Sequence, residues 1–250
     1  MLEIKGLEKK FGSLHVLKGL DLEIPLGQIT VIIGGSGTGK SVLLKHIVGL
    51  IKPDRGQVLL DKRDLNQLGG EALKRERMRF GLLFQDAALF DSMSVFENIA
   101  FPLREHRSDL AEAEVVELVK RKLLQVKLPG IEEKYPSELS GGMRKRVGLA
   151  RATVLDPEIM LYDEPTTGLD PITTKAIDEL IVQTQQDLDA TSVIISHDIQ
   201  STLRIANRIA MLHDGKIVAS GSPREFLESE HKVVRDFLTP ALERIEINGS

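Results

Sequence analysis

The chain has no cysteine, no long apolar run and no excess of positive charge. The absence of cysteine among 250 residues excludes disulfide bonds, thiol catalysis and a cysteine-ligated zinc site, and it suits a reducing compartment. Lysine and arginine number 33 against 37 acidic residues, so the net charge of −4 provides no overall basic field that would gather nucleic acid. The remaining composition, with 42% hydrophobic and 28% charged residues, is that of an ordinary globular protein.

No apolar run approaches the roughly 20 residues that a membrane-spanning helix needs. The first residues, Met1 to Lys5, contain no apolar signal segment. We therefore expect a cytoplasmic protein that works at a membrane only by docking on another protein.

The order of apolar patterns predicts an α/β fold. Helical spacing of apolar residues marks 40–50 and 109–126, the segment 94–152 is almost entirely helical in pattern, and a turn is expected at 52–56. A parallel-sheet core interrupted by a helical lobe is the expected architecture. Short apolar runs bounded by turn residues predict strands at 2–7, 20–24, 29–33, 58–60, 80–84, 159–162 and 192–195.

A glycine-rich loop after the third predicted strand has the spacing G-x-x-x-x-G-K-[ST] and opens a helix. In this context successive backbone N–H groups curl around a polyphosphate, and the helix N-terminus adds partial positive charge. Lys40 would reach the β- and γ-phosphates, and the Ser41 hydroxyl would ligate Mg²⁺. A plain helix-capping turn is the alternative. The loop comprises Gly34, Gly35, Ser36, Gly37, Thr38, Gly39, Lys40 and Ser41.

Two further motifs have both a functional and a structural interpretation. The apolar run 159–162 ends in Asp163 and Glu164, which would hold Mg²⁺ and polarise the attacking water if they lie beside the phosphate loop. An acidic cap is the alternative. Ser140, Gly141 and Gly142 begin a helix expected at 144–155, where they make either a second anion site or an ordinary N-cap.

Taken together, these motifs resemble the ATP-binding-cassette (ABC) family. Their order and spacing match over about residues 1–225, and joint occurrence is far more specific than the phosphate loop alone. The residues that carry the resemblance are Gly34 to Ser41, Gln85, Leu139 to Gly142, Asp163, Glu164, Gly168 to Asp170, and His197.

The resemblance implies an α/β P-loop NTPase fold: a RecA-like core, an antiparallel edge sheet and an inserted helical subdomain. It also implies that ATP and Mg²⁺ are bound and that two copies pair head to tail, the Ser140 loop of one closing on the nucleotide held by Lys40 of the other. Glu164, His197, Lys40 and Gln85 would be catalytic, with Glu164 as the base. Asp163, Ser41 and Gln85 would be the metal ligands. Phe11 would stack on adenine, Val42 would complete the phosphate site, and Asp170 would communicate across the dimer.

Some of these residues have plainer interpretations, and some positions depart from the common pattern. Gln85 and His197 are otherwise loop residues after apolar strands, and Phe11 is otherwise a core residue. Gly35 stands where many cassettes have proline, Met143 where most have glutamine, and Val42 where threonine is frequent. The remaining histidines lack metal-ligand spacing and receive no role.

A narrower resemblance points to the Mla (maintenance of lipid asymmetry) ATPases, on the segment Leu83 to His106, Met143, Gly168 to Ile172, and Val234 to Leu238. It implies phospholipid as cargo. It also implies a place on the cytoplasmic face of the inner membrane, with an integral-membrane permease, an MCE lipid-binding protein and a STAS-domain subunit as partners. Apolar residues between Gln85 and Pro102 would grip the permease, or simply join the lobe to the core.

Alternatives from outside this group remain open. One is an ABC ATPase for another cargo, such as amino acids or lipoproteins, and another is a regulatory cassette that transports nothing. We expect one cassette over 1–228, with its core at 1–90 and 153–228 and its helical subdomain at 91–152. The extension 229–250 would be a docking tail, with apolar residues along one helix face, or a frayed terminus. That face would contain Val233, Val234, Phe237, Leu238 and Leu242.

Overall fold

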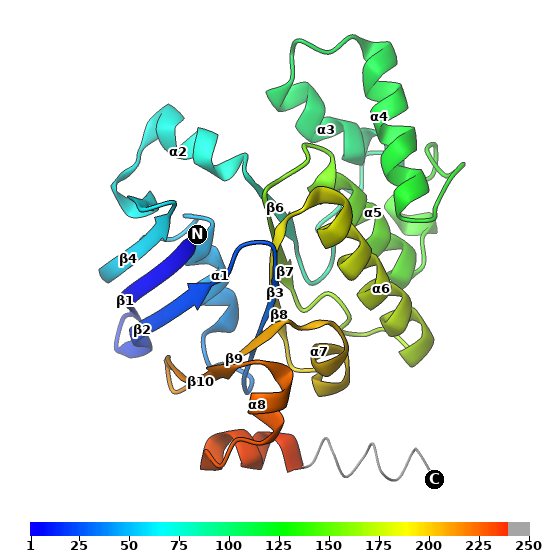
Figure 1. The fold of residues 1–250 in the computed structure, drawn as a ribbon. Helices are drawn as coiled ribbons and strands as arrows, with labels where there is room; N and C mark the ends of the chain where they lie inside the picture. Colours follow the sequence, from blue (N-terminus) through cyan, green and yellow to red (C-terminus); the bar gives the residue numbers. More distant parts are fainter. Residues whose placement is uncertain (240–250) are drawn as a thin grey trace, which may run out of the picture. The chain divides into compact units, whose positions relative to one another are not determined.

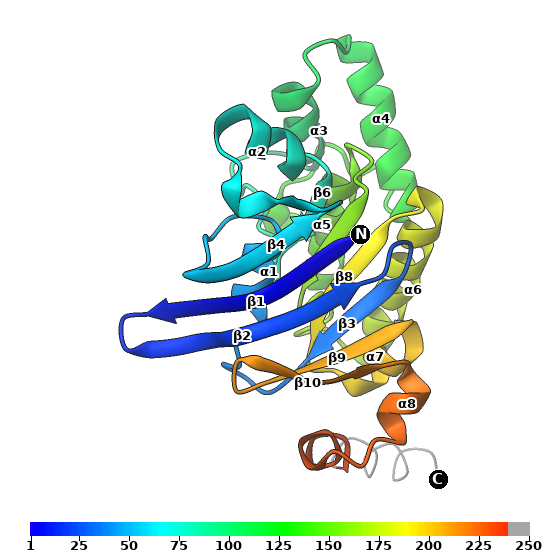
Figure 2. The same ribbon diagram turned by 60° about the vertical axis from the view of Figure 1, so that its left-hand side comes forward.

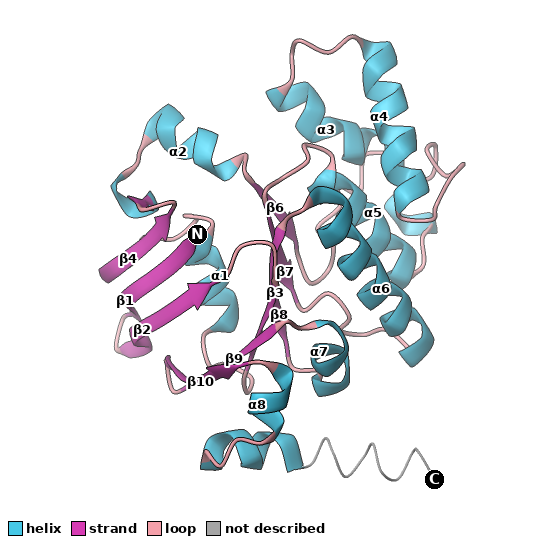
Figure 3. Ribbon diagram, viewed as in Figure 1, coloured by secondary structure: helices cyan, strands magenta, loops and turns pink. Residues whose placement is uncertain are grey.

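The computed structural model describes residues 1–239, and the chain divides into two compact units. The first unit comprises Met1–Arg77 and the chain from Thr191 onward, and the second comprises Met78–Ala190. Helices are concentrated in the second unit, whereas the first is built mainly of strands (Figures 1 and 3).

An antiparallel sheet forms the start of the first unit. Its strands run in the order β2-β1-β4-β5. The long hairpin of β1 and β2, blue in Figure 2, buries alternate residues such as Leu20, Leu22 and Ile24, as expected for a sheet with one covered face. The strands are β1 (Leu2–Phe11), β2 (Leu14–Ile24), β4 (Arg55–Leu60) and β5 (Arg63–Asp64), followed by a 3-10 turn, η1 (Leu65–Gln67), and α2 (Gly70–Arg77).

A second group of strands in this unit runs in the order β10-β9-β3-β8. β3 pairs in parallel with both β8 and β9, and all five of its residues are buried. Strands covered on both faces are continuous apolar runs, which is the pattern of Ile29 to Ile33. The elements are β3 (Ile29–Ile33), α1 (Lys40–Ile47), β8 (Thr191–Ser196), α7 (Ile199–Ile205), β9 (Arg208–His213), β10 (Lys216–Gly221) and α8 (Pro223–Leu227).

The second unit consists of a parallel strand pair and four helices. Ser94 begins α3 with a capping box completed by Glu97, which satisfies two backbone donors at the helix start. Helix α5 contacts α3, α4, α6 and β6, and is therefore the central helix of this unit. The elements are β6 (Phe80–Leu83), α3 (Val95–His106), α4 (Glu112–Gln125), η2 (Pro136–Glu138), α5 (Gly141–Thr153), β7 (Ile159–Asp163) and α6 (Pro171–Leu188).

The described part of the C-terminal segment ends in a helix over 232–239. Val234 and Leu238 are buried, whereas Val233 and Phe237 are only half-buried, so the expected apolar face is in part covered within the chain itself. Leu242 lies outside the described residues. Within 1–239, no helix has both the length and the apolarity to cross a bilayer.

Several sequence-based boundaries need correction. The expected turn at 52–56 is shorter, because Arg55 and Gly56 already belong to β4. The helix after the glycine-rich loop ends at Ile47 and not at Leu50, because the left-handed Gly49 (φ 69°) terminates it. The hairpin of β9 and β10 was not predicted, although Asp214-Gly215 at its turn is a typical hairpin signal.

Candidate functional site: a phosphate loop and a carboxylate edge

The glycine-rich loop of the first unit leaves the carboxyl end of β3. Ile33 is level with Ser196 of β8 in the parallel register, so Gly34 and His197 are the next residues beyond two adjacent strand ends. Ile33 is also level with Met211 of β9. The structure thus brings the loop and His197 to one edge of this sheet, where ligands bind in open parallel sheets.

Neighbouring strands approach the loop so closely at two positions that only glycine fits there without a shift. A Cβ atom at Gly34 would lie 2.2 Å from the carbonyl oxygen of Leu212. At Gly39 it would lie 2.9 Å from Val16 of β2, and Gly39 also holds a left-handed φ of 102°. Gly35 has no such restriction, since its nearest neighbour, a methyl of Thr38, would be 3.7 Å away. The loop therefore fits a shape that the surrounding strands impose.

Lys40 begins α1 and turns back over the loop. Its ammonium donates to the carbonyl oxygens of Gly34 and Gly35, at 2.9 Å each, and Thr38 Oγ1 donates to the Gly35 carbonyl at 2.9 Å. Lys40 is 9% exposed. A cation, a helix N-terminus and a curled glycine loop in one place fit a polyphosphate.

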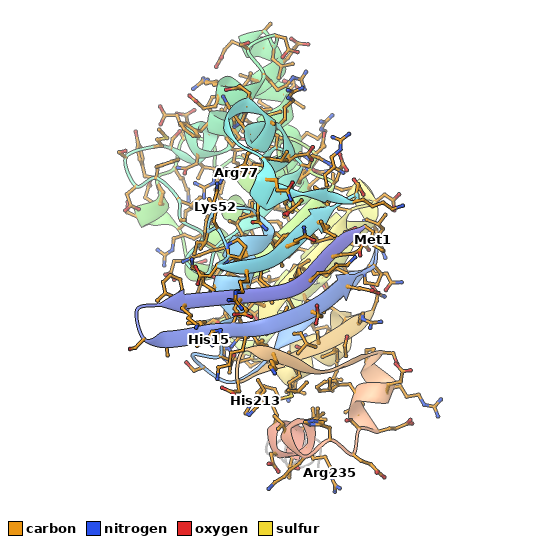
Figure 4. The ribbon with its side chains drawn as sticks, turned by 90° about the vertical axis from the view of Figure 1, so that its left-hand side faces the viewer. Met1, His15, Lys52, Arg77, His213 and Arg235 are labelled. Carbon is orange, nitrogen blue, oxygen red and sulfur yellow. The ribbon has the colours of Figure 1, made fainter. Side chains whose placement is uncertain are left out.

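Phe11 is the last residue of β1 and is 47% exposed, so it does not belong to the core. Asp54 fixes this strand end, accepting bonds from the Lys10 N–H at 2.6 Å and from Lys9 Nζ at 3.1 Å. These bonds hold the pKa of Asp54 below its usual value, and the bond from the Lys10 N–H has the larger effect. The Lys9 ammonium lies 5.5 Å from the Phe11 ring centroid. Lys9 also donates to the carbonyl of Lys52, just before β4. Lys52 is labelled in Figure 4, which looks onto the antiparallel sheet.

The remaining histidines do not form a metal site. His15 lies on β2 and His213 at the end of β9 (Figure 4). His46 is buried on α1, its Nδ1 bonded to the Val42 carbonyl, and burial lowers its pKa. Within the described residues no group of three or more histidine and carboxylate side chains is placed to hold a metal ion.

The second unit has an edge of its own, at the carboxyl ends of β6 and β7. Leu83 is level with Tyr162, so Gln85 and the pair Asp163 and Glu164 emerge from adjacent strand ends. The structure therefore brings these three predicted residues to one edge. Glu164 holds a left-handed backbone conformation with φ 49°, which is rare for a non-glycine residue.

The turn after β7 and a lysine from α5 hold Glu164 in place. Thr167 donates from its hydroxyl to Glu164 Oε2 at 3.0 Å. Lys145 Nζ donates to the Glu164 carbonyl at 3.3 Å and also to the Gln85 carbonyl. Burial lowers the pKa of Lys145, while the charges of Asp86, Glu164 and Asp163 act in the opposite direction. Sequence analysis missed Lys145, because a lysine on an amphipathic helix ordinarily indicates a solvated position.

The loop before α5 contains the ordinary N-cap that was the alternative to a second anion site. Ser140 Oγ accepts the Met143 N–H at 3.3 Å, so Ser140 is the N-cap of α5. Ser140 and Gly141 are nevertheless exposed. A Cβ at Gly142 would lie 2.6 Å from a methyl of Thr173, and Asp170 caps α6 by accepting the Ile172 and Thr173 N–H groups at 3.0 Å each. The starts of α5 and α6 thus lie together.

A strand–loop–helix with a phosphate-cradling lysine defines a P-loop nucleotide-binding protein. The ABC transporter family profile matches residues 17–167. "Probable ribonucleotide transport ATP-binding protein mkl" from Mycobacterium leprae is 46% identical over 237 residues, covering 95% of this chain and 68% of its own. The Haemophilus influenzae "Intermembrane phospholipid transport system ATP-binding protein MlaF" is 42% identical over 238 residues, covering 95% of this chain and 90% of its own.

A solved structure, the dimeric ATP-binding cassette MJ0796 in a post-hydrolysis state bound to ADP and Pi, superimposes with a TM-score of 0.82 at 32% identity. It covers 90% of this chain and 99% of that one. The chain belongs to the ABC transporter family, as one of its ATP-hydrolysing cassettes. The expected α/β P-loop fold, the nucleotide as ligand and the enzyme class are thereby confirmed.

Proposed function

We propose that the chain energises phospholipid transport as the ATPase subunit of a membrane complex. The observation that carries the cargo assignment is the identity of 42% to a phospholipid-transport ATPase over 90% of that protein's length. The mycobacterial relative, at 46%, carries a ribonucleotide name, but the chain spans only 68% of it. Ribonucleotide transport is therefore the second candidate.

Each site residue has a proposed role in hydrolysis. Lys40, with the N–H groups of Gly34 to Ser41 and with Val42, binds the phosphates, and its ammonium exchanges the loop carbonyls for phosphate oxygens. Glu164 accepts a proton from the attacking water. His197 and Gln85 orient the γ-phosphate and that water. Phe11, exposed at its strand end, stacks on adenine.

Ser41, Gln85 and Asp163 are the proposed protein ligands to Mg²⁺. Their hydroxyl, amide and carboxylate oxygens are the hard donors that this ion prefers. When bound, Mg²⁺ neutralises charge on the transferring phosphate. Asp163 is half-buried at the strand end, which suits a carboxylate placed to face a cation instead of bulk water.

A second copy of the chain is the proposed partner in nucleotide binding, since the solved relative is a dimer with ADP and Pi. The exposed Ser140 and Gly141, with Gly142, would cover the nucleotide of the neighbouring copy, and Asp170 would act at the same interface. We propose that the cassette spans 1–228, with a helical subdomain at 91–152, and that 229–250 is a docking tail.

The proposed place of action is the cytoplasmic face of the inner membrane, on an integral-membrane permease, with MCE and STAS-domain proteins as further partners. The rings of Phe90 and Phe101 are in tilted contact, 5.2 Å apart between centroids. These residues are 43% and 37% exposed and form an apolar surface suited to a permease helix. Phe101→Asp should reduce co-purification of the permease without weakening ATP binding. Leu124→Asp, at an apolar residue of α4 that is 65% exposed, is the control that should retain the permease.

Reconstitution of the purified complex into liposomes tests the function directly. With labelled phospholipid, ATP should drive lipid movement, and Glu164→Gln should abolish it. Movement of ribonucleotide, amino acid or lipoprotein in place of phospholipid would refute the cargo assignment. A complex that hydrolyses ATP, contains no membrane protein and moves nothing would favour a regulatory cassette.

A further inference from the structure

Helix α5 carries a buried lysine close to its start. Lys145 is 5% exposed. Lysine is almost never fully buried unless its ammonium is paired, because removing the charge from water is costly. The bonds made by this ammonium should therefore explain its position.

Both bonds of the Lys145 ammonium go to main-chain oxygens at the edge formed by the carboxyl ends of β6 and β7. It donates to the Gln85 carbonyl, beyond β6, and to the Glu164 carbonyl at 3.3 Å, beyond β7. These two residues follow strands that are paired in parallel at Leu83 and Tyr162. One ammonium therefore joins the two loops, and it does so through carbonyl oxygens, which leaves the Gln85 and Glu164 side chains for chemistry.

The same face of α5 holds the Gln85 loop at two more points. A Cβ at Gly148 would lie 2.9 Å from the Ala87 methyl, so this loop approaches the helix closely. Arg151 donates to the Ala87 carbonyl at 2.7 Å. Residues 145, 148 and 151 are spaced by three, which places them along one side of the helix. Lys145 is the member of this row that also bonds to Glu164.

We propose that Lys145 is a positioning residue for ATP hydrolysis, which holds the backbones of Gln85 and Glu164 in one frame attached to α5. The left-handed backbone of Glu164 gives this contact its importance, because rotation of that peptide would redirect the carboxylate away from the attacking water. The inference rests on the proposed role of Glu164 as the base.

Lys145→Met removes the donors and keeps most of the apolar stem. In the purified complex its kcat should fall by at least about tenfold, as expected when a reacting group is displaced by a fraction of an ångström to an ångström. The Kd for ATP and the KM should stay within about twofold of wild type, since Lys145 bonds no residue of the phosphate loop. Lys145→Gln, whose amide still donates but ends one atom earlier, should recover about threefold of that loss and stay about threefold slower than wild type.

Lys122→Met is the matched control. Lys122 is another buried lysine of the second unit, 2% exposed, and its ammonium bonds Asp156 at 2.6 Å. This variant should lower the melting temperature as much as Lys145→Met does, with unchanged kcat. The proposal is overturned if the kcat of Lys145→Met equals that of this control. It is also overturned if the kcat of Lys145→Gln is as low as that of Lys145→Met. If Lys145→Met is insoluble, Lys145→Gln is compared with the control, and equal kcat values overturn it.

A double variant separates positioning from a general effect on the fold. If Lys145 acts by aiming Glu164, Lys145→Met should slow a Glu164→Gln complex by less than about twofold, because the aimed group is already inactive. A further tenfold loss would contradict the proposal. A wild-type complex without ATPase activity would instead refute the proposed function itself, independently of any Lys145 variant.

Discussion

Glu164 adopts a left-handed backbone (φ 49°), a conformation that costs a non-glycine residue about 1–2 kcal/mol. Such strain persists only where neighbouring bonds maintain it, and it is concentrated at functional sites. Here the bonds come from Thr167 and Lys145. The residue therefore combines the acidic chemistry expected from sequence with a conformation that sequence does not indicate.

Glu164→Gln should bind ATP normally and lose hydrolysis by about 10²- to 10⁴-fold, because the amide keeps the shape of the carboxylate but cannot accept a proton. Single-turnover hydrolysis and equilibrium binding of ATP measure the two effects. Glu158→Gln is the control, at an exposed carboxylate just before β7 that is paired with Arg79 at 2.7 Å, and it should hydrolyse ATP like wild type. Equal rates in the two variants would assign the base elsewhere.

The loop glycines allow a second comparison between neighbouring residues. Gly39→Ala forces a methyl to within 2.9 Å of Val16 at a φ of 102°, and should destabilise the fold by more than about 1 kcal/mol and weaken ATP binding. Gly35→Ala adds a methyl with ordinary contacts and should bind ATP like wild type. Denaturant unfolding and nucleotide titration measure both. Equal losses would mean that the loop binds phosphate in a shape other than the one in this structure.

At the scale of elements, α6 begins with a charged cap whose strength depends on pH. The pKa of Asp170 is lowered, first by the Thr173 hydroxyl and then by backbone N–H groups at the helix start. A carboxylate with a lowered pKa contributes stability that is complete above its ordinary value near 3.8 and is lost as pH falls through the lower folded value. The cap should therefore weaken only in acid.

Asp170→Asn tests this cap, because asparagine can cap a helix without a charge. Wild type should exceed the variant in free energy of unfolding at pH 7, and the difference should shrink as the pH falls below about 4. Urea unfolding at a series of pH values measures it. A difference that is independent of pH would exclude the charge of Asp170 as the cause.

The sequence predicted elements better than it predicted the contacts between them. β3 was predicted with its observed ends, because a fully buried parallel strand is a continuous apolar run. Motif order identified the residues of the phosphate loop. It also identified Gln85, Asp163 and Glu164, which the structure brings to one edge of the second unit. Lys145 could not be found in this way, since its carbonyl partners lie 60 and 19 positions away in the chain. No local pattern reports such distant contacts.

At the scale of the whole molecule, association of two copies should depend on nucleotide. ATP retained in the Glu164→Gln variant should shift the chain toward dimers, because a ligand shared by two copies stabilises their pairing by mass action. Ser140→Arg places a bulky side chain at the exposed start of α5, and should prevent that shift and lower hydrolysis. Analytical ultracentrifugation with and without ATP measures association.

Ser222→Arg is the control for the Ser140 variant. Ser222 caps α8 through the Glu225 N–H, as Ser140 caps α5 through the Met143 N–H, so both variants lose a helix cap. The Ser222 variant should still form dimers with ATP. A fully active monomer, or equal effects of the two variants, would refute a shared nucleotide site.

The attachment of Lys145 to carbonyl oxygens, and not to side chains, has a consequence for how such a protein can change over generations. Every residue type at positions 85 and 164 presents a carbonyl, so the two bonds from Lys145 do not depend on which side chains stand at these positions. With Glu164 in its proposed role as the base, a single codon change at position 164 would silence hydrolysis while Lys145 still holds both loops. An inactive cassette that still folds and still occupies its place in an assembly would then lie one mutation away from an active one.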